Sequence, residues 1–229
     1  MCHHLSSTPS KRVPGQHHLT LHTQPTYRGL PVLNCARGFV SEYLDRLYYT
    51  IHRAMQSYSR IFAVRVDLHF PQNYFPGGQE VLSNEYLHLF IKVLRRWRKQ
   101  YKNEKQQLGR RVHDAGSEYV WAREYGPSHH KPHFHLLLLF NGNAFKSLGH
   151  FSSAHESLYN RIGESWAEAL GLPIAGGVKF VYFPSDGQYL LDSRNQDRLA
   201  QVFCRASYLA KVASKKFDDR CHVFGGSRS

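Results

Sequence analysis

The sequence predicts an α+β fold, a central antiparallel sheet with helices packed mainly on one face. Three observations lead to this prediction. Segments with apolar residues at helical spacing alternate along the chain with short strands that carry one polar face. Two of the strands are joined by a short turn, as in an antiparallel hairpin. The apolar content of 41% and the charged content of 21% are typical of a globular chain, and 229 residues suffice for one sizeable core.

The N-terminal segment is predicted to be a flexible or loosely packed arm. Residues 1–36 are rich in His, Pro, Ser and Thr and show no helical or strand periodicity. Residues 37–229 are then expected to form a single domain.

The first half of that domain is predicted to contain a helix, a strand and a second helix. Residues 38–58 and residues 83–108 carry apolar side chains at helical spacing. Between them, in RIFAVRVDLHFP, apolar residues alternate with Arg65, Asp67 and His69. This alternation predicts a strand with one face in the core and one polar face.

The helix over residues 83–108 has a basic face that carries Lys92, Arg95, Arg96 and Lys99. A charge run of this kind is often a solvated helix face, and it also suits nucleic acid phosphates. Both interpretations stay open, and the second makes these four residues candidate nucleic-acid-binding groups.

The second half of the domain is predicted to begin with a hairpin formed by EYVWAREYG and HFHLLLLF. A helix follows, with Leu158, Ile162, Trp166 and Leu170 four residues apart. GGVKFVYFPS is expected to form a further strand, and DRLAQVFCRASYLAKVASKKF the last long helix. The terminal GGSRS is expected to be a fraying tail.

The charge balance indicates a polyanionic partner. Thirty Lys and Arg against seventeen Asp and Glu give a net charge of +13 and a pI near 9.7, and nucleic acid is the commonest polyanion. No apolar stretch reaches 18 residues, and the four cysteines form no framework. We therefore expect a soluble, cytoplasmic protein with reduced thiols and no membrane partner.

The triplet His133-Phe134-His135 is a candidate metal site. Side chains two apart on a strand share a face, so the two imidazoles project together. Glu124 on the partner strand would be the third ligand if the hairpin register pairs it with one of them. Two histidines and a carboxylate suit a catalytic metal with open positions. The alternative is a pair of polar residues at a strand end.

Tyr208 lies off the apolar stripe of the last predicted helix, roughly 180° away on a helical wheel. Lys211 and Lys215 fall on its side of the helix. A tyrosine hydroxyl can attack a phosphodiester when a metal polarises the phosphate, and nearby lysines can hold that phosphate. The alternative is an exposed tyrosine beside solvated lysines.

The combination of Glu124, the His-Phe-His strand and Tyr208 followed three residues later by Lys211 resembles the HUH endonuclease superfamily. The segments RVDLHFP, EYGPSHHKPHFHLLLLF, SYLAKVASK and FGGSR most resemble the gene-II-type rolling-circle replication proteins of filamentous phages and prophages. The similarity covers about residues 58–229.

This resemblance implies an HUH-like sheet in which His133, His135 and Glu124 bind Mg²⁺ or Mn²⁺. Tyr208 would attack a DNA phosphate and leave a 3′-hydroxyl and a 5′-phosphotyrosine bond, with Lys211 as the lysine of the tyrosine motif. The expected partner is single-stranded DNA at the replication origin of a phage or mobile element in a bacterial cytoplasm. Arg65 and Lys215 are further candidate contacts to this DNA.

Two features refine the expectation. Tyr182 and Tyr189 lie outside the tyrosine motif, so a single-tyrosine enzyme is predicted. The sequence has no Gly-rich nucleotide-binding loop, so any helicase would be a separate protein. The competing hypothesis is a non-catalytic, basic nucleic-acid-binding regulator on a similar sheet.

Overall fold

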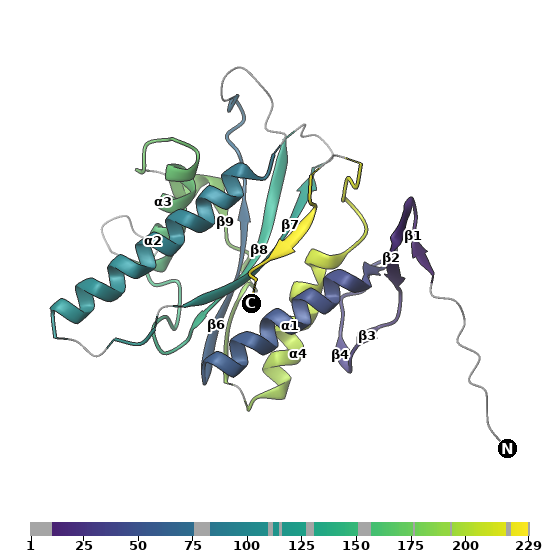
Figure 1. Ribbon diagram of the computed structural model, residues 1–229, viewed down its shortest axis with the longest axis horizontal. Coiled ribbons are helices and arrows are strands. Elements are labelled where there is room, and N and C mark those ends of the chain that lie inside the picture. Colours follow the sequence, from purple (N-terminus) through teal and green to yellow (C-terminus); the bar gives the residue numbers. More distant parts are fainter. Residues whose placement is uncertain are drawn as a thin grey trace.

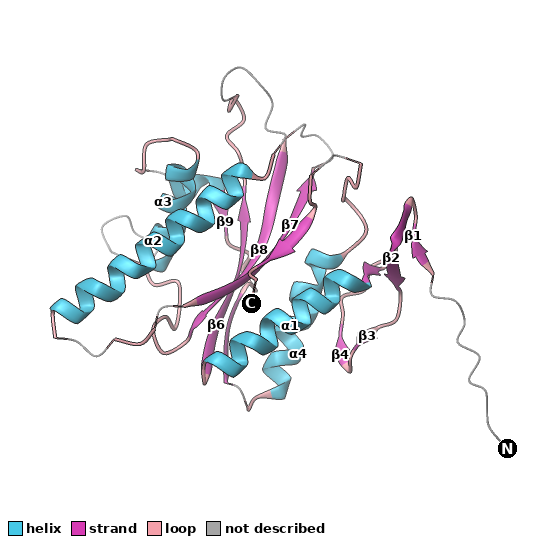
Figure 2. Ribbon diagram, in the orientation of Figure 1, coloured by secondary structure: helices cyan, strands magenta, loops and turns pink. Residues whose placement is uncertain are grey.

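The computed structural model describes residues 11–75, 83–109, 112–114, 116–126, 131–150, 157–175, 177–192, 194–218 and 221–228. Within these ranges, four α-helices surround a central antiparallel sheet, which confirms the α+β class (Figures 1 and 2). None of the helices in the described ranges is long and apolar enough to cross a membrane.

The central sheet has a β-hairpin at its middle. Its strands run in the order β10 (Gln188–Asp192), β6 (Arg60–Leu68), β8 (Pro132–Asn141), β7 (Ser117–Tyr125) and β11 (Phe224–Gly226), and β9 (Val181–Tyr182) pairs with the end of β6. All of these pairs are antiparallel. The hairpin that the sequence predicts is therefore β7 and β8, and the predicted alternating strand is β6.

Helices cover both faces of this sheet. Helices α2 (Glu85–Gln107) and α3 (Leu158–Ala169) lie on one face, and α1 (Ser41–Ser57) and α4 (Gln196–Ser207) lie on the other (Figure 1). The expectation of helices mainly on one face is therefore corrected.

The physical reason lies in the apolar run of β8. Leu136 and Leu138 pack in the core under α2 and α3, whereas Leu137 and Leu139 pack in the core under α1 and α4. Because consecutive strand residues point to opposite faces, a run of this kind needs a helical layer on each side.

The predicted N-terminal arm is wrong from residue 12 onward, and residues 1–10 lie outside the described ranges. Four short strands lie in the segment, β1 (Arg12–Val13), β2 (Gln16–His22), β3 (Thr26–Tyr27) and β4 (Leu30–Pro31), and β5 (Phe39–Val40) follows it. Val13 and Leu19 are buried beside Val40. Four of these strands have only two residues, too few to produce a periodic pattern, and the segment is ordered by packing against the rest of the chain.

The last helix ends earlier than predicted. Helix α4 stops at Ser207, a 3₁₀ turn η3 follows over Tyr208–Ala210, and Lys211 has extended backbone that forms a bridge with Phe39. The Val212 N–H donates to the Gly38 carbonyl, so the chain here is bound to the N-terminal segment. A contact far away in sequence overrides the local helical pattern.

Two other segments differ from the expectation. In the described part of GGVKFVYFPS, Gly177–Phe180 forms a 3₁₀ helix η2, and the strand is limited to β9. The C-terminal segment is not a fraying tail, because β11 pairs with Val120–Ala122 of β7 and Phe224 stacks on Tyr43 at 4.2 Å between ring centroids.

Candidate metal centre

The strand register brings four polar side chains to one end of the sheet. Glu124 of β7 lies directly opposite His133 of β8, and Asp67 of β6 lies opposite His135. Paired residues share a face, so all four project toward the side covered by α1 and α4. Further along β8 the same face carries Leu137 and Leu139, which are in the core. The site thus lies at the end of β8 next to the core residues of this face of the sheet.

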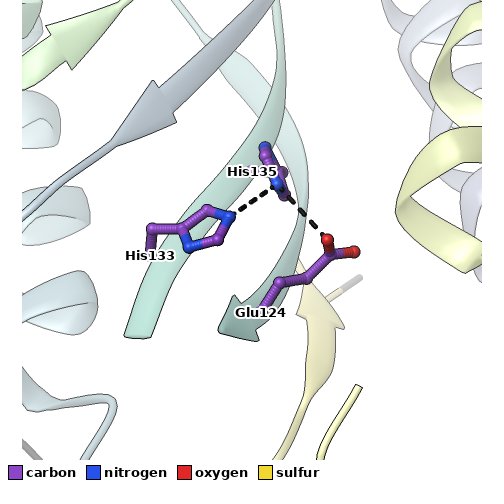
Figure 3. A group of neighbouring side chains, drawn as sticks. All are labelled: Glu124, His133 and His135. Carbon is purple, nitrogen blue, oxygen red and sulfur yellow. Dashed lines mark hydrogen bonds and ion pairs between the residues drawn. The ribbon is translucent and has the colours of Figure 1, made fainter. Parts of the chain in front are cut away.

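Glu124, His133 and His135 offer three ligand atoms that all lie within 4.8 Å of one another. The His135 Nε2 atom is 3.1 Å from His133 Nε2 and 3.4 Å from Glu124 Oε2. Two ligand atoms held about 2.1 Å from one cation at angles of about 90–110° lie roughly 3.0–3.4 Å apart, so the separations of His135 from His133 and from Glu124 suit ligands of one divalent cation. Figure 3 shows the three side chains pointing toward one another from β7 and β8.

A buried carboxylate fixes the orientation of the His135 ring. His135 Nδ1 is 2.7 Å from Asp67 Oδ1, and the Arg65 guanidinium donates to the same oxygen at 3.0 Å. Burial alone would raise the pKa of Asp67, but the bonds to His135 and Arg65 outweigh burial and lower it. The ionised carboxylate can only accept, so Nδ1 donates and Nε2 faces the other two ligands.

The two histidines differ in their affinity for a proton. Burial, together with the neighbouring His135 and His69, lowers the pKa of His133 to about 4. Burial also acts to lower the pKa of His135, but its hydrogen bonds with Asp67 and Glu124 outweigh this and raise it. His133 is therefore neutral near pH 7, whereas a cation at His135 must compete with a proton.

Glu124 is 1% exposed and is surrounded by cationic groups. Lys211 Nζ lies 2.9 Å from Oε2, Lys215 Nζ lies 3.0 Å from Oε1, and the Ser214 hydroxyl donates to Oε2 at 2.7 Å. Burial acts to raise the pKa of Glu124, but the bond to His135 and the charges of Lys215 and Lys211 outweigh it and hold the pKa far below its ordinary value. The carboxylate is therefore ionised, and a metal cation would compete with these lysines for its oxygens.

Lys215 is not placed as a DNA contact, which corrects the sequence prediction. Its side chain is 0% exposed and its ammonium is bound to Glu124. Burial lowers the pKa of Lys215 to about 8. The helical wheel put Lys215 beside Tyr208, but the chain leaves the helix after Ser207 and turns Lys215 inward.

The structure does bring Tyr208 to the metal cluster. Its ring packs edge-on against His135, with 5.3 Å between the ring centroids. Lys211 Nζ lies 3.5 Å from the centre of the Tyr208 ring, and the Arg65 guanidinium lies 5.3 Å from it. Arg65 is itself buried and bound to Asp67. The predicted nucleophile, its lysine and the predicted ligands are thus neighbours.

A pocket of about 210 Å³ opens beside Tyr208. Its inner part is formed by the site residues Arg65, Asp67 and His135, and its outer part by Leu33, Tyr182, Pro184 and Arg205. Sequence reasoning missed these four. The signal for Tyr182 is its pairing with Asp67 in the sheet, which no local pattern reveals.

The basic face of α2 is not brought to this site. Lys92, Arg95, Arg96 and Lys99 are exposed, and α2 packs on the opposite face of the sheet. Arg96 there forms an ion pair with Glu168 at 2.5 Å. Any contact of these residues with nucleic acid would be separate from the metal cluster.

Comparisons with known proteins identify relatives of this chain. It is 33% identical over 199 residues to the uncharacterized protein YfjJ of Escherichia coli K12, and the alignment covers 82% of this chain and 95% of that protein. It is 29% identical over 199 residues to the uncharacterized protein YagK of the same organism, and the alignment covers 82% of this chain and 93% of YagK.

A solved structure of the N-terminal nuclease domain of minute virus of mice non-structural protein 1 aligns with 65% of this chain and 78% of that domain, at 13% identity and a TM-score of 0.26. A likeness this slight carries no argument about the chain. The model of the YagK/YfjJ C-terminal domain, in contrast, matches residues 22–227, nearly the whole sequence. The chain belongs to the YagK/YfjJ C-terminal domain family.

Proposed function

We propose that this protein is a metal-dependent endonuclease that nicks single-stranded DNA through a covalent phosphotyrosine, as its resemblance to HUH enzymes implies. The observation that carries the proposal is the packing of Tyr208 against His135 within the Glu124–His133–His135 cluster. A tyrosine beside two imidazoles and a carboxylate is the minimum set for metal-assisted attack on a phosphodiester.

In the proposed reaction, Glu124, His133 and His135 hold Mg²⁺ or Mn²⁺, which when bound would polarise the scissile phosphate. The Tyr208 oxygen attacks phosphorus and loses its proton, and the bond from phosphorus to the 3′-oxygen breaks. The 3′-oxygen takes up a proton and leaves as a hydroxyl, while the 5′-phosphate stays bonded to Tyr208.

Lys211 has a defined part in this scheme. Its ammonium is bound to the Glu124 oxygen nearest His135 and lies over the Tyr208 ring. That oxygen also accepts from the Ser214 hydroxyl, and a cation that binds there would repel the Lys211 ammonium because the two carry like charge. The freed ammonium then faces Tyr208 and can stabilise the phenolate or the phosphate.

The biological role we propose is initiation of rolling-circle replication of a phage or mobile element in a bacterial cytoplasm, with a separate helicase. Its support is the resemblance of four sequence segments to gene-II-type proteins and the net charge of +13.

The decisive experiment incubates the protein with a pool of labelled, randomised single-stranded DNA and Mn²⁺ or EDTA, followed by denaturing gels. We expect an SDS-resistant protein–DNA adduct that requires Mn²⁺ and is absent in Tyr208→Phe. Tyr49→Phe is the matched control, because Tyr49 is an exposed tyrosine on α1 outside the site. An adduct that persists in Tyr208→Phe would refute Tyr208 as nucleophile. Intact DNA binding without any adduct would favour the non-catalytic regulator.

A further inference from the structure

Two pockets adjoin next to Tyr208. The first, of about 210 Å³, reaches the metal cluster. The second, of about 430 Å³, is lined by Pro31, Tyr189 and Cys204. Leu33 and Arg205 line both pockets, so the two are neighbours beside α4. We call the two pockets together the α4 groove.

The first pocket suits one unpaired planar ring. Its volume is below the roughly 300–1,000 Å³ of pockets for drug-sized ligands, so it does not admit a base pair. Tyr182, which lines this pocket, is 58% exposed, so its ring is open to a ligand. The backbone of Tyr182 is held in β9 opposite Asp67, which directs its side chain to the site face of the sheet. An exposed aromatic ring on a rigid strand is a platform on which a base stacks.

Arg205 stands at the boundary between the two pockets. Its guanidinium lies 3.4 Å from Asp186, and the two side chains are 39% and 70% exposed. An ion pair this open to solvent is weak, so the guanidinium is available to another anion. A phosphate between two bases, one in each pocket, would lie beside Arg205, and a guanidinium group can bind a phosphate through two parallel hydrogen bonds.

We infer that the α4 groove binds single-stranded DNA, with the base beside the scissile phosphate stacked on Tyr182. The adjoining phosphate contacts Arg205, and the next base lies in the second pocket against Tyr189 and Pro31. This inference rests on the proposed function, because it takes Tyr208 as the nucleophile and so places the scissile phosphate beside it. It places the specific DNA path on the α4 side of the sheet and not on the basic face of α2.

The test measures binding apart from chemistry, by fluorescence anisotropy of labelled hexathymidylate in EDTA. We expect Tyr182→Ala to weaken binding roughly tenfold and Tyr182→Phe to retain it, since stacking needs the ring and not the hydroxyl. We expect Arg205→Gln to weaken binding several-fold and to reduce the slope of log affinity against log salt by about 0.7. Arg96→Gln is the matched control, because Arg96 is also a part-exposed arginine paired with a carboxylate.

Wild-type affinity in both Tyr182→Ala and Arg205→Gln, with unchanged thermal unfolding, would overturn the inference. So would an equal loss in Arg96→Gln, or binding of a duplex as tight as that of the single strand.

Failure of the proposed function would give a different result. Groove-dependent binding with no adduct from the wild-type protein would refute the nickase and leave the groove. An adduct formed equally well by Tyr182→Ala would refute the groove alone.

Discussion

Glu124 is the residue on which the candidate site depends most. Its carboxylate accepts from Ser214, pairs with Lys211 and Lys215, and faces the His135 ring, all at 1% exposure. The two lysines offset the cost of burying the ionised carboxylate, and the carboxylate offsets the cost of burying them. The same arrangement means that removing one charge leaves others buried without a partner.

We expect Glu124→Gln to lower the free energy of unfolding by about 3 kcal/mol, because it leaves the buried Lys215 ammonium uncompensated. It should also abolish Mn²⁺ binding. Urea unfolding and Mn²⁺ electron paramagnetic resonance measure the two effects. Glu118→Gln is the control on the same strand, since the more exposed Glu118–Arg53 pair should be worth about 1 kcal/mol or less. Equal losses in the two variants would contradict the assigned role of Glu124.

Cation binding should depend on pH through His135. The pKa of His135 is raised above its ordinary value of 6.5 by its bonds to Asp67 and Glu124, which outweigh burial. A proton and a cation compete for the ring, so Mn²⁺ affinity should begin to fall at a pH above 6.5 as the solution is acidified. His133, with its pKa lowered to about 4, should not contribute in that range.

The variant Asp67→Asn separates this explanation from a general effect of acid. Loss of the Asp67 carboxylate removes the bond that raises the pKa of His135 most, so the fall in Mn²⁺ affinity should move to lower pH. The measurement is Mn²⁺ titration from pH 5 to 8. A pH profile unchanged from wild type would exclude His135 as the titrating ligand.

At the scale of elements, the position of Tyr208 depends on how α4 ends. Ser207 is fully buried at the end of the helix, where its hydroxyl accepts from the Leu33 N–H at 3.0 Å and donates to the Cys204 carbonyl at 2.7 Å. This hydroxyl connects the helix to the N-terminal segment directly before Tyr208. The N-terminal strands are therefore part of the structure that positions the proposed nucleophile.

We expect Ser207→Ala to lower the free energy of unfolding by about 1–2 kcal/mol, because the Leu33 N–H loses its partner in a mostly buried place. Adduct formation should fall further than stability alone explains, because Tyr208 loses its support. The control is Ser57→Ala, since the exposed Ser57 hydroxyl makes a similar bond to Arg53 at the end of α1. Full adduct formation in a destabilised Ser207→Ala would contradict this coupling.

The elements differ in how far the sequence predicts them. The β6 strand follows from local alternation, and the β7–β8 hairpin follows from the spacing of its strands and the turn between them. The pairing of Glu124 with His133 is one of the two registers that would make Glu124 a ligand. The end of α4 was not predictable from local pattern, because the bond from Val212 to Gly38 joins distant segments. The continuous apolar run of β8, in contrast, did contain the signal for two helical layers, which the α+β prediction did not use.

At the scale of the whole molecule, the sheet separates two surfaces. The metal cluster and the α4 groove lie on the side of α1 and α4, and the basic face of α2 lies on the other. The net charge of +13 is a property of the whole chain and does not say which surface binds DNA. A short strand in the groove and a long strand that wraps around the molecule should therefore respond differently to loss of charge.

The variant that carries Lys92→Gln, Arg95→Gln, Arg96→Gln and Lys99→Gln tests this separation by lowering the net charge to 13 − 4 = +9. The α4 groove and α2 lie on opposite faces of the sheet, so the affinity of hexathymidylate bound in the groove should stay within about twofold of wild type, because surface charges beyond about 10 Å are screened. A long single strand can contact both surfaces. Its salt slope should decrease by up to about 3, since each phosphate contact contributes roughly 0.7.

Anisotropy titrations of both DNA lengths between low and moderate salt measure the two slopes. An unchanged slope for the long strand would show that the basic face of α2 is only a solvated helix face. Loss of hexathymidylate binding would instead place the DNA path on α2 and away from Tyr208. The sheet lies between the two surfaces. Comparison of the short and the long DNA strand therefore shows whether DNA binds in the α4 groove, on the basic face of α2, or on both.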